Sequence, residues 1–231
     1  MDTTQAQHTN RQYEEDLREL RAGLIKMGGL AERQIADAVD SLVNRDSEKA
    51  RVTIAGDAEV NRMDIECDER CLNLLALHQP AAGDLRFITT GLKITTDLER
   101  IGDNAVNICE RAVELNEEPQ LKPYIDIPRM AEVAQSMVKD SIDAFVRKDV
   151  ELAREVIDRD DVVDNLQHQI YRELLSYMAE DPHTIGRSTK ILFVSKYLER
   201  IADHATNIAE MVIFMVKGKN IKHMDKNQGI L

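Results

Sequence analysis

The chain has 231 residues, of which 43% are hydrophobic and 31% are charged, and its formal net charge is −12. This composition is typical of a folded, water-soluble protein, and the negative charge argues against a protein that binds nucleic acid. Ten Gly, five Pro and no Trp leave few turn residues, which disfavours many short strands and favours long helices.

Three cysteines and the length of the longest apolar run indicate the cellular compartment of the protein. Cys67, Cys71 and Cys109 form an odd set, so we expect free thiols in a reducing compartment rather than a disulfide framework. The longest apolar run, 211–216, is much shorter than a membrane span. The N-terminus lacks the basic and then apolar pattern of a signal peptide. We therefore expect a cytoplasmic protein without direct membrane insertion.

Apolar residues recur at helical spacing in six segments. The first segment, 10–44, is followed by Asp46, a typical helix N-cap. The second extends to about residue 77 and ends before Pro80. The third covers 82–115. These three segments predict three long helices joined by short turns.

A segment rich in proline separates these helices from three more. Pro119, Pro123 and Pro128 lie close together there, as is common at a domain boundary. The later helices are predicted over 128–147, 149–180 and 184–216. The predicted organisation is a first repeat over 10–117, a linker over 118–127, a second repeat over 128–217 and a polar C-terminal tail over 218–231.

Thirteen residues of the third helix recur one hundred residues later. Segment 98–110 reads LERIGDNAVNICE and segment 198–210 reads LERIADHATNIAE, with nine identities. The second and fifth helices match at an offset of 103, because Asp57-x-x-Val60 aligns with Asp160-x-x-Val163. The chain is therefore predicted to be all-α, a tandem repeat of two antiparallel three-helix bundles, each large enough to bury a core of its own.

Each copy carries a Glu-x-x-x-Asp pair followed by an Asn. A rotation of about 100° per residue sets these side chains opposite the apolar stripe of their helix, so we expect an outer, solvated face and no buried groups with raised pKa values. No Lys lies four residues from Glu99 or Glu199 to pair with it. Acids stacked one turn apart repel each other unless a cation lies between them, and oxygen ligands at this spacing suit a hard or borderline cation.

The second and fifth helices offer further oxygen ligands. Asp160 and Asp164 lie one turn apart on the fifth helix, and Asp57 and Asn61 hold the matching places on the second. Because Asn61 is neutral, we expect the first half to bind a cation more weakly.

Two kinds of side chain next to these acids have more than one interpretation. Arg100 and Arg200 follow the Glu of each copy, and they either pair with the acids or contact an anion. His204 replaces Asn104, and it is either an ordinary surface His or a group close to a metal.

The duplicated L-E-R-I-[GA]-D motif, the E-x-x-x-D spacing and the segment 79–86 (QPAAGDLR) resemble the PhoU family, and the likeness covers 13–218. The resemblance implies a cytoplasmic regulator of phosphate uptake. Such proteins act with the ATPase subunit of the phosphate ABC importer and with a membrane sensor histidine kinase, and they hold phosphate-starvation signalling off. Some members carry multinuclear iron or zinc clusters. Carried onto this chain, the ligands would be Glu99, Asp103, Asn107, Asp57 and Asn61, and Glu199, Asp203, Asn207, Asp160 and Asp164.

Two other functions remain open on the sequence. A ferritin-like carboxylate oxidase needs Glu-x-x-His pairs that project inward, whereas the one such pair here, Glu180 and His183, is interrupted by Pro182. A purely structural helical oligomer is the second alternative. We expect no enzyme, because neither a Gly-rich phosphate loop nor a nucleophile elbow is present. A homodimer is expected.

Overall fold

The structure, a computed structural model, describes the backbone of residues 3–218, which contains helices and no strand. The polar tail predicted at 218–231 lies outside this range except for its first residue. The helices are α1 Thr3–Val43, α2 Ser47–His78, α3 Ala82–Asn116, α4 Asp126–Arg147, α5 Val150–Glu180 and α6 Ile185–Lys217, with a short 3₁₀ helix at Pro182–Thr184. The all-α prediction is confirmed, although α1 begins earlier than predicted.

The two helical hairpins, α1–α2 and α4–α5, have the same turn conformation and the same type of helix cap. Arg45 and Lys148 both adopt left-handed backbone conformations, with φ of 57° and 55°. The following residue caps the next helix: Asp46 accepts a hydrogen bond from the Lys49 amide, and Asp149 accepts one from the Leu152 amide. The left-handed residue and the capping Asp each recur 103 residues later, so the hairpins correspond residue by residue at that offset.

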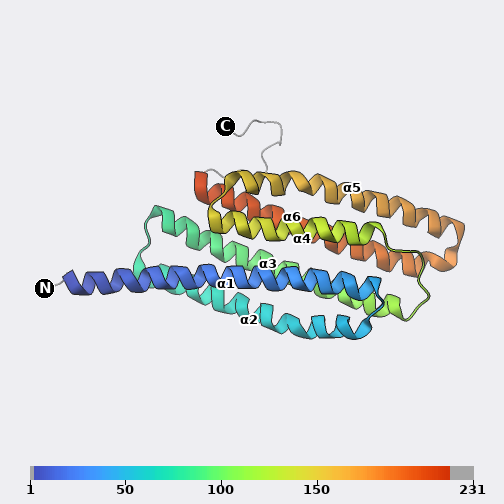
Figure 1. Cartoon of the computed structure of the whole chain (residues 1–231), viewed down its shortest axis with the longest axis horizontal. Helices are drawn as coiled ribbons and strands as arrows, with labels where there is room; N and C mark the ends of the chain where they lie inside the picture. Colours follow the sequence, from blue (N-terminus) through green and yellow to red (C-terminus); the bar gives the residue numbers. More distant parts are fainter. Residues whose placement is uncertain (1–2, 219–231) are drawn as a thin grey trace.

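The helices form two layers (Figure 1). One layer contains α2, α3, α6 and α5 in that order, and α1 and α4 lie side by side across α3 and α6. The central helices α3 and α6 run in opposite directions, since Asp97 contacts His204 while the earlier Arg86 contacts the later Met215. Each half is a three-helix bundle, and the halves meet along α3–α6 and α1–α4.

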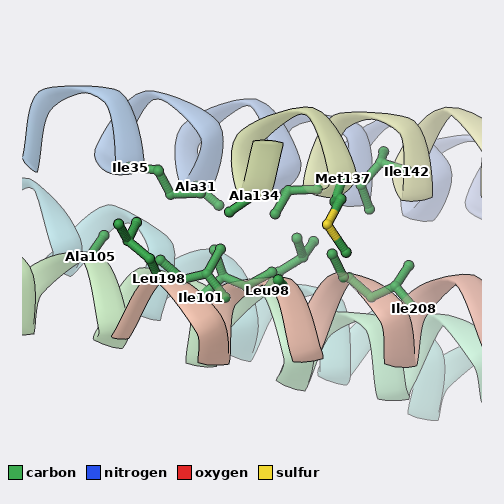
Figure 2. Close-up of a cluster of buried hydrophobic side chains, with 14 of the residues drawn as sticks. Ala31, Ile35, Leu98, Ile101, Ala105, Ala134, Met137, Ile142, Leu198 and Ile208 are labelled. Atoms are coloured by element: carbon green, nitrogen blue, oxygen red, sulfur yellow. The ribbon is translucent and has the colours of Figure 1, made fainter. Parts of the chain in front are cut away.

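The halves share one hydrophobic core, although each half was expected to be large enough to bury its own. Figure 2 shows side chains of α1, α3, α4 and α6 meeting in the middle of the molecule, among them Ile35, Leu98, Met137 and Leu198. Leu98 and Leu198, which hold the same place in the two copies, are both fully buried. The duplicated apolar stripe therefore packs against the other half as well as its own.

The segment between the halves is anchored to both of them. Arg45 donates hydrogen bonds to the backbone carbonyls of Asn116 and Glu118. Lys122 is buried and forms an ion pair with Glu173 of α5. The α3–α4 connection therefore contacts helices of both halves.

Two other expectations concern the thiols and the membrane. Cys67, Cys71 and Cys109 are all free and buried, as expected from their odd number. Among the helices of residues 3–218, none is both long enough and apolar enough to cross a membrane.

Candidate functional site

The first acidic face consists of side chains of α2 and α3. We define it by Asp57, Asn61, Asp64, Asp68, Glu99, Asp103 and Asn107. Asp57 is its innermost member and is only 9% exposed. Its two carboxylate oxygens accept hydrogen bonds from Gln34 of α1, at 3.0 Å, and from Asn61, at 2.9 Å. Two neutral amide donors thus hold a nearly buried carboxylate.

Gly102 explains how Asp57 lies so close to α3. A Cβ atom at this position would lie 3.0 Å from Asp57 Oδ1 and 3.1 Å from Gln34 Oε1, which is too close for comfortable packing. The second copy has a fully buried Ala202 at the matching place. The innermost carboxylate of the first face therefore depends on a glycine that the second copy lacks.

Glu99 lies at the centre of the first acidic face. Its pKa is raised, first by desolvation and then by the negative charge of Asp103, with smaller contributions from Asp64 and Asp57. Arg100 opposes this effect, because its guanidinium lies 3.4 Å from Glu99 and 3.1 Å from Asp103. The fold thus brings acids of α2 and α3 together, as predicted, and Arg100 pairs with them.

The second acidic face consists of Asp160 and Asp164 on α5 and Glu199, Asp203 and Asn207 on α6. Desolvation is the largest cause of the raised pKa of Asp203, although this residue keeps contact with solvent; the charges of Glu199 and Asp164 raise the pKa further. Lys196 pairs with Glu199 Oε1 at 2.5 Å. Within residues 11–218, the buried Glu199 Oε2 has no hydrogen-bond partner.

One expectation about these acids is wrong. We expected no raised pKa values, but desolvation and nearby like charges raise the pKa of Glu99 and the pKa of Asp203. No Lys lies four residues from Glu99 or Glu199, but cations of the same helix reach the acids at other spacings. Lys196 and Arg100 reach the acids at spacings of three and one.

An asparagine follows the Glu-x-x-x-Asp pair in each copy of the motif. Asn107 and Asn207 are half-buried, and their side chains form no hydrogen bond within the described part of the chain.

His204 joins the two halves instead of standing alone on the surface. Its Nδ1 lies 2.8 Å from Oδ1 of Asp97, a buried residue of α3. Asp97 precedes Glu99 by two residues, and His204 follows Asp203. A polar contact therefore crosses the α3–α6 seam between the two acidic faces. The matching Asn104 donates a hydrogen bond to the Arg100 carbonyl of its own helix.

The donor atoms of these faces suit a cation, but no preassembled site is found among the described residues. Nowhere in the described residues do three or more His, Cys, Asp or Glu side chains lie in an arrangement ready to hold a metal ion. Carboxylate oxygens are nevertheless ligands of hard and borderline cations, and the orphaned Glu199 Oε2 is a free acceptor. The second face fits better, because both oxygens of Asp57 in the first face already accept amide hydrogen bonds.

The pair considered for an oxidase site does not project into the protein. Glu180 ends α5 and His183 lies in the following 3₁₀ helix, and both are exposed. These positions differ from the inward-facing Glu-x-x-His pairs that a di-metal carboxylate site requires.

Comparison with known sequences gives consistent matches over most of the chain. Residues 24–112 and 127–212 match the family model described as PhoU domain. The phosphate-specific transport system accessory protein PhoU homolog of Aquifex aeolicus is 44% identical over 208 residues, which cover 90% of this chain and 94% of that protein. The homolog of Caulobacter vibrioides is 43% identical over 216 residues, which cover 93% of this chain and 94% of its own length.

Solved structures agree with the sequence matches. The crystal structure of PhoU from Pseudomonas aeruginosa has a TM-score of 0.86 at 41% identity and covers 90% of this chain and 100% of that chain. The phosphate transport system regulatory protein PhoU from Streptococcus pneumoniae has a TM-score of 0.85 at 26% identity and covers 90% and 98%. These findings confirm the resemblance inferred from the duplicated motif: the chain belongs to the PhoU domain family.

Proposed function

We propose that this protein regulates phosphate uptake in the cytoplasm. It would modulate a high-affinity phosphate ABC importer and repress phosphate-starvation signalling. The observation that carries the proposal is the 41–44% identity, over at least nine-tenths of this chain, to proteins named as accessory proteins of the phosphate-specific transport system. Coverage of that extent favours a shared role as well as a shared fold.

The proposed mode of action is docking without catalysis. The partners are the ATPase subunit of the importer and a phosphate-sensing membrane histidine kinase. The layer of four helices offers a broad surface with an acidic face in each half, and these charges favour encounter with basic surfaces. We also propose that the protein forms a homodimer, which light scattering on the purified chain would test.

Cation binding is the second part of the proposal. The second face would hold iron or zinc through Glu199, Asp203, Asp160 and Asp164, with Asn207 one turn further along α6. The first face would hold it through Glu99, Asp103, Asn107, Asp57 and Asn61. A bound cation would supply positive charge that screens the repulsion among these carboxylates.

A reporter strain tests the regulatory role. In a host that lacks its own copy of this protein, we expect phosphate-starvation reporter expression at high phosphate, and the wild-type chain should repress it. Failure of the folded wild-type chain to repress would contradict the regulatory function.

The same strain tests the acidic face. The double variant Glu199→Gln/Asp203→Asn should repress less, whereas Glu180→Gln, a neutralised exposed acid at the end of α5, should behave as wild type. Full repression by the double variant would contradict a role for the second acidic face. Binding of purified protein to the ATPase subunit and to the kinase, measured separately, assigns the effect to one partner or both.

A further inference from the structure

A cavity between α1 and α2 lies outside the two acidic faces. Its volume is about 160 Å³, and its polar lining is formed by Arg33, Gln34, Asp37 and Thr53, with Gly56 on α2. The cavity opens toward solvent, because Val52, which also lines it, is 64% exposed. Since water occupies about 30 Å³ per molecule, a side-chain head group has room here.

The matching place in the second half is filled by an arginine. The offset of 103 between the two hairpins sets Gly56 against Arg159, Asp37 against Asp140 and Arg33 against Ser136. The shared left-handed residues and helix caps at this offset establish the register. The hairpins thus offer an internal comparison of one site with and without an arginine.

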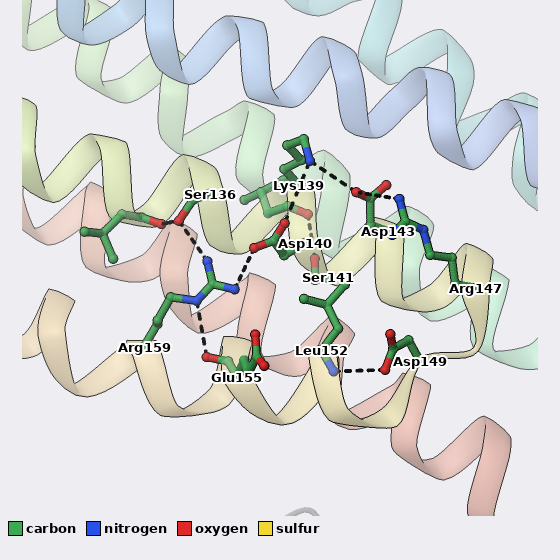
Figure 3. A network of polar contacts seen from close by, with 12 residues as sticks. Ser136, Lys139, Asp140, Ser141, Asp143, Arg147, Asp149, Leu152, Glu155 and Arg159 are labelled. Carbon is green, nitrogen blue, oxygen red and sulfur yellow. Dashed lines mark hydrogen bonds and ion pairs between the residues drawn. The ribbon is translucent and has the colours of Figure 1, made fainter.

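Figure 3 shows the guanidinium of Arg159 lying between α4 and α5. Its Nη2 donates to Asp140 at 2.6 Å, its Nη1 donates to the Ser136 hydroxyl at 3.1 Å, and its Nε donates to the Glu155 carbonyl at 3.3 Å. A carboxylate on one helix and a backbone carbonyl on the other thus hold the planar fork.

The first half retains two of the three acceptors but lacks the arginine. A Cβ atom at Gly56 would meet nothing within 4 Å. Asp37 takes the place of Asp140, and the Val52 carbonyl takes the place of the Glu155 carbonyl. Lys49 lies 3.3 Å from Asp37, but it lies closer to Asp40, at 2.6 Å. Asp140 likewise has Lys139 at 3.8 Å in addition to Arg159, so one nearby ammonium group is compatible with a bound guanidinium.

We propose that this cavity binds a guanidinium group from outside the chain, with Asp37 as its counter-ion. An arginine head group matches the cavity better than an ammonium group. At the corresponding place in the second half, Arg159 uses three donors of one planar guanidinium group. Arg33 stands where the second half has Ser136, and within residues 11–218 its side chain forms no hydrogen bond or ion pair. Arg33 must extend into solvent when a second guanidinium enters.

Titration of the full chain with L-argininamide, followed by amide chemical shifts, tests the proposal. We expect saturable shifts around Gly56 and weaker binding of lysinamide. Loss of a charge-assisted hydrogen bond should make argininamide binding to Asp37→Asn about tenfold weaker. Arg33→Ser, which installs the residue of the second half, should bind at least as tightly as wild type. Equal binding to wild type and Asp37→Asn, or no saturation, would overturn the proposal.

Two exchanges between the halves control for the position of the site. Gly56→Arg should fill the cavity and abolish argininamide binding while the far-ultraviolet dichroism stays that of a folded helical protein. Arg159→Gly should open the corresponding cavity and add a second binding event. Persistent binding to folded Gly56→Arg would place the ligand elsewhere and contradict the assignment.

The source of the guanidinium group is settled with a second probe. A blocked tripeptide with a central arginine is compared with free argininamide. Tighter binding of the peptide would indicate an arginine of a protein partner, and binding of the free compound alone would indicate a small guanidinium metabolite. Binding of neither would overturn the proposal.

Discussion

The two halves have the same order of helices and the same capped turns but differ in the polar side chains between their helices. In the first half, Gly102 leaves room for a nearly buried Asp57 held by two amides. In the second half, the buried Ala202 stands at the position of Gly102, and Arg159 stands at the position where Gly56 leaves the cavity open. Duplication has preserved the capped turns and the apolar stripes, whereas the polar contacts have diverged. Equivalent positions in the two halves therefore have unequal charge environments.

The largest expected effect comes from the shared core. Leu98→Ala and Leu198→Ala each remove a fully buried side chain and should each lower the free energy of unfolding by about 2–5 kcal/mol. Because the halves share the core, urea unfolding of either variant should remain a single transition. Exposed Val52→Ala is the control and should change stability by less than about 0.5 kcal/mol. Two separate transitions would show that the halves unfold independently.

Exchange of the glycine and the alanine should affect the halves differently. Gly102→Ala places a Cβ atom against Asp57 and Gln34. Overpacking should lower the free energy of unfolding by about 1–3 kcal/mol, and the higher helix propensity of Ala should offset about 1 kcal/mol of that loss. Ala202→Gly should cost about 1 kcal/mol through helix propensity and about 1 kcal/mol more through the lost burial of its methyl group. Adding Asp57→Ala to Gly102→Ala should remove part of the clash. The urea midpoints of the three variants measure these changes in stability. A Gly102→Ala variant more stable than wild type would contradict the clash, because it would mean that Asp57 and Gln34 move aside at no cost.

The contact across the seam should have a smaller effect. His204→Asn gives the second copy the residue of the first and leaves the buried Asp97 without its partner, at a cost of about 1–2 kcal/mol. Thermal unfolding beside the double variant Asp97→Asn/His204→Asn tests this assignment. The double variant should lose less than the sum of the single changes. Strict additivity would show that the two side chains do not interact energetically.

The pH dependence of the acidic faces should be the smallest effect. The pKa of Asp203 is raised above its ordinary value of 3.8, so the folded state binds this proton more tightly than the unfolded state. Between the ordinary and the raised pKa, stability should therefore fall as pH rises. Asp203→Asn should make this part of the stability curve flatter and should be slightly more stable than wild type at neutral pH. A steeper curve in Asp203→Asn would reverse the sign and contradict the account.

The sequence was sufficient to predict the helices, the repeat and the pairing of acids from neighbouring helices. Those features follow from the apolar periodicity and from motifs such as 98–110 and 198–210. The shared core could not be predicted, because a buried stripe does not reveal whether it faces its own half or the other half.

Contacts that depend on tertiary packing also escaped prediction. Gln34 donates to Asp57 from another helix, and its counterpart at the offset of 103 is Met137, so the repeat gave no signal. The contact between His204 and Asp97 depends on how the halves pack. One signal was available: Asp46 and Asp149, with Asp37 and Asp140, share the offset of 103 and would have extended the repeat to the first and fourth helices.

Metal titration of matched variants tests the central claim, that the acidic faces bind cations and do so unequally. Calorimetric titration with Zn²⁺ compares wild type with Glu99→Gln/Asp103→Asn and with Glu199→Gln/Asp203→Asn. We predict that the tighter sites are lost with the second pair, because Asp57 of the first face is already occupied by amide donors. Zn²⁺ and Fe²⁺ binding that neither pair of substitutions changes would contradict the account.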